Sequence, residues 1–380
     1  MKMKKSFVLI YAFCQCAFLY TFGQLDNEIF SDKYPVQESD SGAIKFGFDV
    51  SGYFWNNEYA TDIAAGYTLF GYQFKPYFSY FPSERIRLDL GGFFMKDFGD
   101  SSFTDIRPIL TIKYKRKNFA FLFGTIEGAA SHRLIEPLYY LQRVVNRRIE
   151  DGFQFKWTSD RLFLDVWLDW VNMIRFGDPQ QEEFNVGLSF NYLVYDSRNF
   201  KLELPVQFLA NHLGGEIDTN PNPSITYFNA ALGFSLIFPM PGITWLDEIR
   251  TDNYCADYFT GEDPFEFPFG EGQGFFAKVS GKYKGFELML SYWNGHRFIA
   301  PQGTPIYQSV AWDYSSSGYT EEDRELLFLR IMYEQKFKGG LSLAFRFEPV
   351  YDFGNSNLDH MEVLFLRYNT DFLLNKRKRK

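Results

Sequence analysis

Four histidines are the residues of this sequence best suited to metal binding or acid–base chemistry. They are His132, His212, His296 and His360, and no two of them stand at the short separation of a metal site. No serine lies two residues from any of them, so no local serine–histidine pattern of a hydrolase is present. We therefore expect no metal, no cofactor and no catalytic residue, and interpret the histidines as scattered loop residues.

A second kind of chemistry, electrostatic binding of ions, is suggested by residues 127–152, EGAASHRLIEPLYYLQRVVNRRIEDG. Pro137 and the apolar spacing of Leu138, Leu141, Val145 and Ile149 predict a short helix. The charged and tyrosine side chains of the segment fall on its other faces: Arg133, Glu136, Tyr140, Arg143, Arg147, Arg148, Glu150 and Asp151.

The first 23 residues have the layout of a secretory signal peptide, with lysines followed by an apolar run. Its removal would take away Lys2, Lys4 and Lys5 and change the formal net charge from −8 to −11, which disfavours nucleic acid as a partner. Only Cys255 of the three cysteines would remain, so no internal disulfide can stabilise the exported chain. We expect one domain, because no linker interrupts the sequence.

Aromatic residues make up 20% of the chain, although its mean hydropathy is only −0.26. Their arrangement is alternating. In the stretch RLFLDVWLDW (161–170), one face carries Leu162, Leu164 and Val166, and the other carries Asp165 and Asp169. Similar alternation recurs along the chain in segments of about 10–14 residues, longer than usual soluble strands.

Short turns alternate with long loops between these segments, as expected of an up-and-down meander. If the sheet faced a soluble core, its charged face would need a cover that the sequence lacks. Closure into a barrel in a bilayer places the apolar face in lipid, the charged face in a wet interior, and pairs all backbone groups. Both chain ends on one side require an even number of strands. Admitting the weak segment 243–259 gives about 16, with seven short turns and eight long loops; 14 is the alternative.

At the level of pattern, the sequence resembles Gram-negative outer-membrane β-barrel proteins, and among them the porins. The final strand supports this, because Leu364, Leu366, Tyr368 and Phe372 share one face as in the terminal strand that the barrel-assembly machinery recognises. The expected organisation is a signal peptide (1–23), an N-terminal periplasmic segment (24–42), an all-β transmembrane antiparallel barrel (43–374) and a basic tail (375–380). The tail is a departure from the family pattern.

The resemblance implies that the third external loop, 127–151, enters the barrel and constricts it, with the eight charged and tyrosine residues above at the constriction. The alternation along each predicted strand also places a set of charged residues on the inward-facing wall of the pore: Arg85, Arg87, Asp89, Arg107, Lys113, Asp165, Asp169, Lys278, Lys282, Arg346 and Arg367. A third loop found inside the lumen would favour a pore, and one found outside would favour a closed or catalytic barrel.

The expected function is a non-enzymatic channel for passive passage of small hydrophilic solutes, anions among them. Two alternatives remain open: a transporter of apolar ligands resembling fatty-acid porins, and a closed barrel with an enzymatic or assembly role at its rim. The expected partners are outer-membrane lipid and lipopolysaccharide, the barrel-assembly machinery and small solutes. Whether the chain forms a homo-oligomer is left open.

Overall fold

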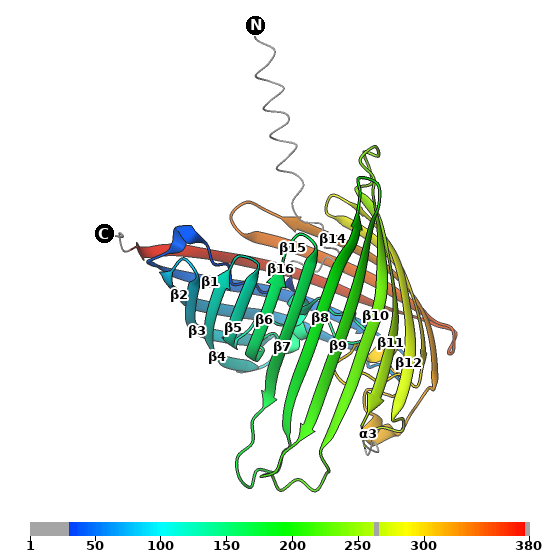
Figure 1. The fold of residues 1–380 in the computed structure, drawn as a ribbon. Coiled ribbons are helices and arrows are strands. Elements are labelled where there is room, and N and C mark those ends of the chain that lie inside the picture. The colour runs from blue at the N-terminus through cyan, green and yellow to red at the C-terminus, as the bar shows by residue number, and fades with distance from the viewer. Residues whose placement is uncertain (1–29, 262–265, 377–380) are drawn as a thin grey trace.

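A computed structural model describes residues 30–261 and 266–376 as a closed barrel of 16 antiparallel strands (Figure 1). Every strand pairs with its neighbours in the sequence. The strands are β1 Ala43–Glu58, β2 Tyr67–Ser83, β3 Ile86–Asp97, β4 Asp105–Arg116, β5 Phe119–Thr125, β6 Asp151–Thr158, β7 Leu162–Asn172, β8 Glu182–Asp196, β9 Lys201–Gly214, β10 Ile225–Pro239, β11 Glu248–Thr260, β12 Glu271–Tyr283, β13 Phe286–His296, β14 Asp323–Lys336, β15 Leu341–Asp352 and β16 Asn357–Lys376.

Closure occurs between the first and last strands. β1 and β16 pair from Ala43 opposite Lys376 to Glu58 opposite His360, with one irregularity near Ile44. Both ends of the barrel chain therefore lie on one side, as the even strand number requires. The expected all-β up-and-down barrel of 16 strands is confirmed. Among the residues described, no helix is long and apolar enough to cross a membrane.

Buried and more exposed side chains alternate along each strand, and this alternation distinguishes the inner face of the barrel from the outer face. On β7, Phe163, Asp165 and Trp167 are buried inside the barrel, whereas Leu164 and Trp170 lie on the outer wall. The outer face therefore carries aliphatic and aromatic side chains suited to lipid, and the inner face carries charges and a few large aromatic rings.

The seven connections at one end of the barrel and the eight at the other alternate as predicted, with three corrections to the expected bounds and lengths of segments. β11 begins at Glu248 rather than 243, because residues 240–247 form a turn closed by the amide of Met240 donating to the carbonyl of Asp247. The last connection, 353–356, is a tight turn instead of a long loop. β16 extends to Lys376 and so includes two residues expected in the basic tail.

The chain before β1 is partly inside the barrel. Of the segment 24–42, expected to be periplasmic, Phe30, Asp32, Tyr34 and Val36 are buried, and η2 (Glu38–Asp40) leads into β1. The predicted signal peptide and residues 377–380 of the tail lie outside the described residues.

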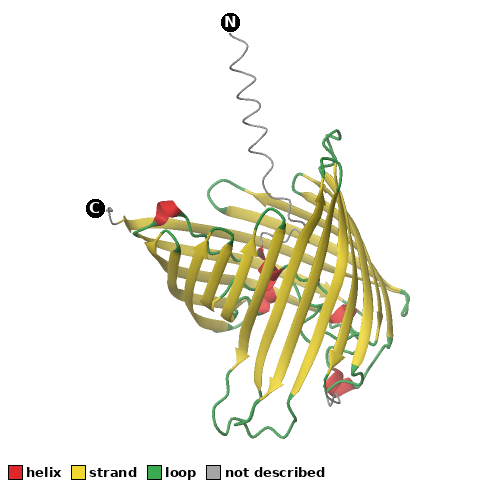
Figure 2. Cartoon of the chain, in the orientation of Figure 1, coloured by secondary structure: helices red, strands yellow, loops and turns green. Residues whose placement is uncertain are grey.

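Short helices lie in two of the loops, where Figure 2 draws them in red. They are η3 Ala129–His132 and α2 Arg143–Asn146 in the third loop, and η4 Pro305–Tyr307 and α3 Tyr314–Ser317 in the loop between β13 and β14. The third loop thus has two single turns of helix where the apolar spacing predicted one continuous short helix. Figure 2 shows η3 and α2 inside the ring of strands.

Candidate functional site

The third loop, residues 126–150, folds into the lumen and is held there by buried ion pairs. Glu136 accepts bonds from Arg346 at 2.8 and 2.9 Å and pairs with Arg330 at 2.8 Å. Arg148 pairs with Asp49 of β1 at 2.7 Å. The expected position of the loop inside the barrel is thus observed.

The residues predicted for the constriction are mostly engaged with the protein itself. Arg143 is buried, donates to Gln302 at 2.7 Å and lies 3.5 Å from Asp169. Arg133 lies over the Phe163 ring at 4.0 Å. Arg147 is half-buried at the end of α2. Asp151 is the first residue of β6 and not part of the loop. Arg143 and Arg148, two of the four arginines predicted for the constriction, are therefore bonded to residues of the protein itself.

Glu150 and Tyr140 have different environments. Glu150 is fully buried and accepts a hydrogen bond from the Tyr139 hydroxyl at 2.8 Å. The Tyr140 backbone amide donates to the carbonyl of Gln302 at 2.8 Å, so this part of the third loop is bonded to the loop between β13 and β14.

His132 was expected to be a scattered loop residue, but its ring is buried and held by three neighbouring side chains. Its Nδ1 lies 3.0 Å from Asp165 and its Nε2 2.9 Å from Glu150, and its ring stacks on Trp167 with centroids 3.6 Å apart. Burial disfavours the charged ring, but the carboxylates of Glu150 and Asp165 outweigh it and raise the pKa of His132 to about 8. Both ring nitrogens are occupied, so His132 serves as a structural cation between two carboxylates.

The predicted wall residues divide into two groups. Eight of the eleven are buried on the inner face: Arg87, Asp89, Lys113, Asp165, Asp169, Lys278, Arg346 and Arg367. The other three are more exposed, because Arg85 belongs to the turn 84–85, Arg107 pairs with Asp105 at the end of β4, and Lys282 is near the end of β12. Most of the buried charges pair with neighbours, as Arg87 does with Asp89 at 2.8 Å.

A second loop, residues 297–322, also packs inside the barrel, which sequence reasoning missed. Phe298, Ile299 and Tyr307 are fully buried against Trp293 of β13. A Cβ at Gly303 would lie 2.1 Å from the carbonyl oxygen of Pro137, so the two loops approach closely here. The apolar run FIAP at 298–301 was the available sequence signal.

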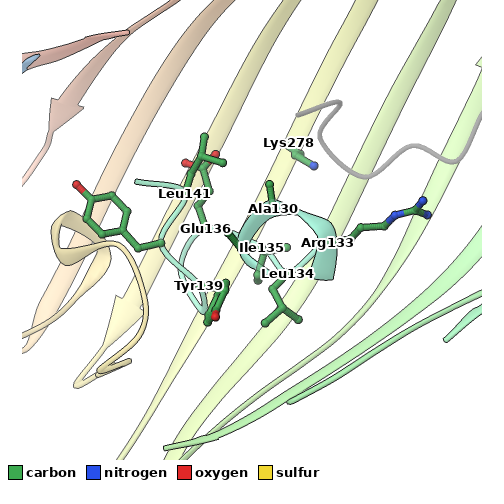
Figure 3. A pocket seen from close by; sticks show the side chains of 10 residues that line it. Ala130, Arg133, Leu134, Ile135, Glu136, Tyr139, Leu141 and Lys278 are labelled. Carbon is green, nitrogen blue, oxygen red and sulfur yellow. The ribbon is translucent and has the colours of Figure 1, made fainter. Parts of the chain in front are cut away.

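A small cavity of about 30 Å³ remains beside the third loop, and Figure 3 shows the side chains around it. Arg133, Glu136 and Tyr140 line it from the loop, and Lys278 lines it from β12. The space is about that of one water molecule.

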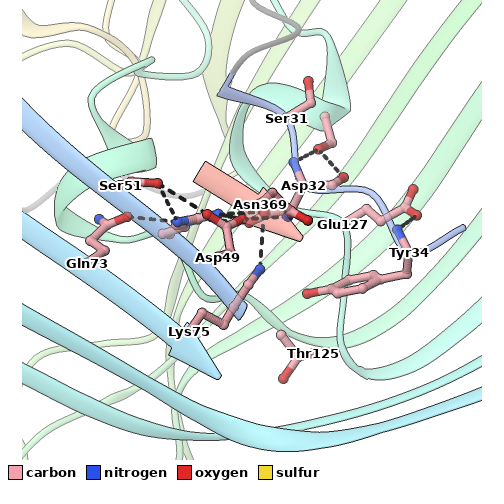
Figure 4. Close-up of polar contacts among 12 residues, drawn as sticks. Ser31, Asp32, Tyr34, Asp49, Ser51, Gln73, Lys75, Thr125, Glu127 and Asn369 are labelled. Carbon is pink, nitrogen blue, oxygen red and sulfur yellow. Dashed lines mark hydrogen bonds and ion pairs between the residues drawn. The ribbon is translucent and has the colours of Figure 1, made fainter. Parts of the chain in front are cut away.

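The N-terminal segment also packs inside the barrel, and Figure 4 shows its polar contacts. Asp32 lies among Lys75, Arg148 and Arg367, and the amide of Tyr34 donates to Glu127 at 2.9 Å. These contacts join residues roughly 40 to 335 positions apart in sequence, so no local pattern could have predicted them.

A different polar cluster, here called the outer-wall cluster, lies on the lipid-facing side at the loop end of β16, β1 and β2. Its members are His360 and Glu362 on β16, Asn56 and Glu58 on β1, and Thr68 on β2. The Asn56 amide donates to Glu58 at 2.9 Å and to Glu362 at 3.2 Å, and the Thr68 hydroxyl donates to Asn56 at 2.5 Å.

Pairing in the sheet brings the rest of this cluster together. Glu58 stands directly opposite His360, and Asn56 directly opposite Glu362. Opposed residues of antiparallel strands have Cβ atoms about 4.5–5.5 Å apart. A sequence signal was present: positions 56, 58, 360 and 362 continue the apolar phase of their strands but carry polar residues.

Below the outer-wall cluster, the wall becomes apolar. Phe54 and Phe70 contact each other with ring centroids 5.8 Å apart, and Phe70 contacts Phe98 at 4.7 Å. Leu364 follows on β16 and is 46% exposed. A lipid lying against these strands would therefore have its acyl chains beside aromatic and aliphatic groups and its polar part beside the cluster.

The two remaining histidines are also near strand ends. His212 of β9 lies 2.9 Å from the Thr226 hydroxyl, and His296 of β13 lies 2.7 Å from Asp323. Within residues 30–261 and 266–376, no group of three or more histidine, cysteine or acidic residues is arranged to hold a metal ion.

Comparisons with known proteins give a family and a fold. A family model described as lipid A 3'-O-deacylase-type matches residues 36–377. The outer membrane protein OprD from Pseudomonas aeruginosa is similar in structure, with a TM-score of 0.53 and 11% identity over 88% of this chain and 97% of that chain. OmpTdeltaL8, a loop deletion mutant of the outer membrane protein OmpT of Vibrio cholerae, is also similar in structure. Its TM-score is 0.51 and its sequence identity 13%, over 87% of this chain and 100% of that chain. No curated protein matches. The expected porin-like outer-membrane barrel is confirmed at the level of fold.

Proposed function

The chain belongs to the lipid A 3'-O-deacylase-type family, and from that premise we propose that it hydrolyses an ester-linked acyl chain of a lipid A-type glycolipid at the outer wall of its barrel. The observation that carries this proposal is the outer-wall cluster. A histidine, two carboxylates, an amide and a hydroxyl gather on the outer face at the loop end of three neighbouring strands, where they would lie against a polar group of the outer leaflet. The head of a glycolipid supplies such a group.

The chemistry assigned to the outer-wall cluster is ester hydrolysis by water. His360 acts as the general base that takes a proton from water while the oxygen attacks the ester carbonyl carbon. Glu58, opposite His360, stabilises the imidazolium that forms. The bond to the sugar oxygen then breaks, the proton passes from His360 to that oxygen, and a fatty acid and a sugar hydroxyl are released.

Donors for the developing negative charge lie beside this base. The Thr68 hydroxyl and the Asn56 amide are the neutral donors of the cluster, and Glu58 and Glu362 fix the orientation of the amide. Each donor aimed at such an oxyanion contributes on the order of 10²–10³ to the rate. In the free protein Asn56 donates to the carboxylates, so a bound ester must take over one of these bonds.

The packing of loops inside the barrel is compatible with the same proposal. Buried ion pairs of the third loop and the apolar packing of residues 297–322 occupy the inside of the barrel, which suits a scaffold for chemistry at its outer surface. The expectation of a non-enzymatic channel would be overturned by this activity.

The test is fatty-acid release from vesicles that contain lipid A and the folded protein. We expect wild type to release fatty acid, and His360→Ala to release it about 10²–10⁴-fold more slowly. Glu58→Gln should also lower the rate of release. His212→Ala is the matched control, because His212 also lies near the loop end of its strand but outside the cluster. Equal release by wild type and His360→Ala would refute the assignment of the base.

A channel for small hydrophilic solutes, anions among them, is the second candidate. What favours it is the third loop within the lumen and the cavity beside it, which is lined by Arg133 and Lys278. In this proposal the third loop is the constriction and its arginines select anions. Single-channel conductance in planar bilayers tests it: an anion preference that falls in Arg143→Ala/Arg147→Ala supports the channel, whereas folded protein without conductance contradicts it.

A further inference from the structure

Asp32 is a carboxylate held in the lumen by three cations of the barrel (Figure 4). Arg148 of the third loop donates hydrogen bonds to both carboxylate oxygens of Asp32, from Nε to Oδ2 at 3.0 Å and from Nη2 to Oδ1 at 2.7 Å. Lys75 of β2 and Arg367 of β16 bind Oδ1 at 3.1 and 2.8 Å. Two-point contact of a guanidinium with a carboxylate is the geometry by which arginine recognises that group.

The backbone positions of the three cations do not depend on Asp32. Lys75 and Arg367 project from strands that pair along their length, and Arg148 also binds Asp49 at 2.7 Å and the Gln73 side chain at 3.0 Å. With Asp49 as the remaining acid, the group without Asp32 has a net charge of +2. A buried charge of this size is costly unless an anion replaces the lost carboxylate.

The segment that carries Asp32 is attached differently from the barrel strands. Residues 30–37 pair with no strand. The segment is held by its side chains and by separate bonds to its backbone, such as that from Arg87 to the carbonyl of Pro35 at 3.1 Å and that from Arg367 to the carbonyl of Ser31 at 2.8 Å. Its removal would therefore break no ladder of the sheet.

We propose that Lys75, Arg148 and Arg367 form a binding site for a carboxylate-bearing solute in the lumen, and that Asp32 occupies this site as an internal ligand. A solute carboxylate exchanges with Asp32, and the N-terminal segment then leaves the cluster. This inference goes beyond the proposed hydrolysis and does not depend on it, because the site lies inside the barrel and the cluster of His360 lies outside.

The first experiment is carboxylate rescue of Asp32→Ala. We expect this variant to unfold at least tenfold faster in urea than wild type, and sodium formate to reverse most of the change in a saturable way. Sodium chloride at equal ionic strength is the salt control. Asp40→Ala is the matched variant, because Asp40 pairs with Lys45 near the start of β1, and it should show no specific response to formate. If Asp32→Ala does not fold, Asp32→Asn is measured in the same way.

The second experiment tests exchange in wild type, through tryptic cleavage after Lys33. Lys33 is next to Asp32, so a segment that leaves the site becomes cleavable. Formate should accelerate cleavage at this bond in wild type more than chloride does. Equal responses of the Asp32 variant to formate and chloride would overturn the site. Rescue without accelerated cleavage in wild type would overturn the exchange and leave Asp32 as a permanent anchor.

Discussion

Replacing Glu136 by alanine tests whether buried ion pairs hold the third loop inside the barrel. Glu136 bonds to both Arg346 and Arg330, and Glu348 is the second acid of this buried group. The four charges sum to zero. Without Glu136, two buried arginines share one carboxylate, and the net charge becomes +1.

The expected cost follows from that uncompensated charge. Removing one partner of a buried ion pair typically costs about 3–5 kcal/mol, whereas replacing both partners by apolar groups is often close to neutral. Glu136→Ala should therefore lower the free energy of unfolding by about 3–5 kcal/mol. The double variant Glu136→Met/Arg346→Met, which leaves Arg330 with Glu348, should recover most of the loss.

The assay is reversible urea unfolding of the protein in lipid vesicles, followed by tryptophan fluorescence. Glu322→Gln is the control, because the Arg297–Glu322 pair has side chains 46% and 49% exposed and such pairs contribute only about 0–1 kcal/mol. A loss below about 1 kcal/mol in Glu136→Ala would refute the reasoning, since the loop would then be held by other contacts.

Three further predictions concern the barrel. The pKa of His132 is raised to about 8, so its protonated ring should stabilise the fold by about 2 kcal/mol below pH 6.5, and this stabilisation should be lost as the pH rises through 8. The urea midpoint of wild type should therefore be lower at pH 9 than at pH 6. The midpoint of His132→Gln should not show this difference. A Cβ at Gly187 would lie 2.0 Å from the Trp167 ring, so Gly187→Ala should destabilise the fold by about 1–3 kcal/mol, measured by the same unfolding assay, and an unchanged midpoint would contradict the packing. Val166 lies on the outer face of β7, so Val166→Arg should cost about 2–4 kcal/mol in vesicles, and a neutral result would contradict its lipid exposure.

The barrel could be predicted from the sequence because lipid imposes a simple rule on each strand. On β7, the aliphatic phase through Leu162 and Leu168 and the acidic phase through Asp165 and Asp169 correspond directly to the two faces. The rule failed at 243–247, where Ile243 and Trp245 alternate with other residues but lie exposed in a turn. Local apolar alternation does not distinguish a strand from a turn at the membrane surface.

The contents of the lumen could be predicted only in part. Fold-level resemblance placed the third loop inside, but its partners come from far along the chain: Arg148 binds residue 32, and Glu136 binds residue 346. A single sequence carries no periodic signal for such contacts. His360 differs from its predicted loop position, because it lies on β16 in the apolar phase of the strand. Its polar neighbour Glu58 lies on the paired strand β1, far away in the sequence, so local spacing gives no signal for the cluster.

The most direct test of the account is the mass spectrum of lipid A after incubation with the folded protein in vesicles. The proposed reaction predicts loss of an ester-linked acyl chain in the presence of wild type and His212→Ala, and retention of that chain with His360→Ala. Intact lipid A in the presence of folded wild type would contradict hydrolysis at the outer wall.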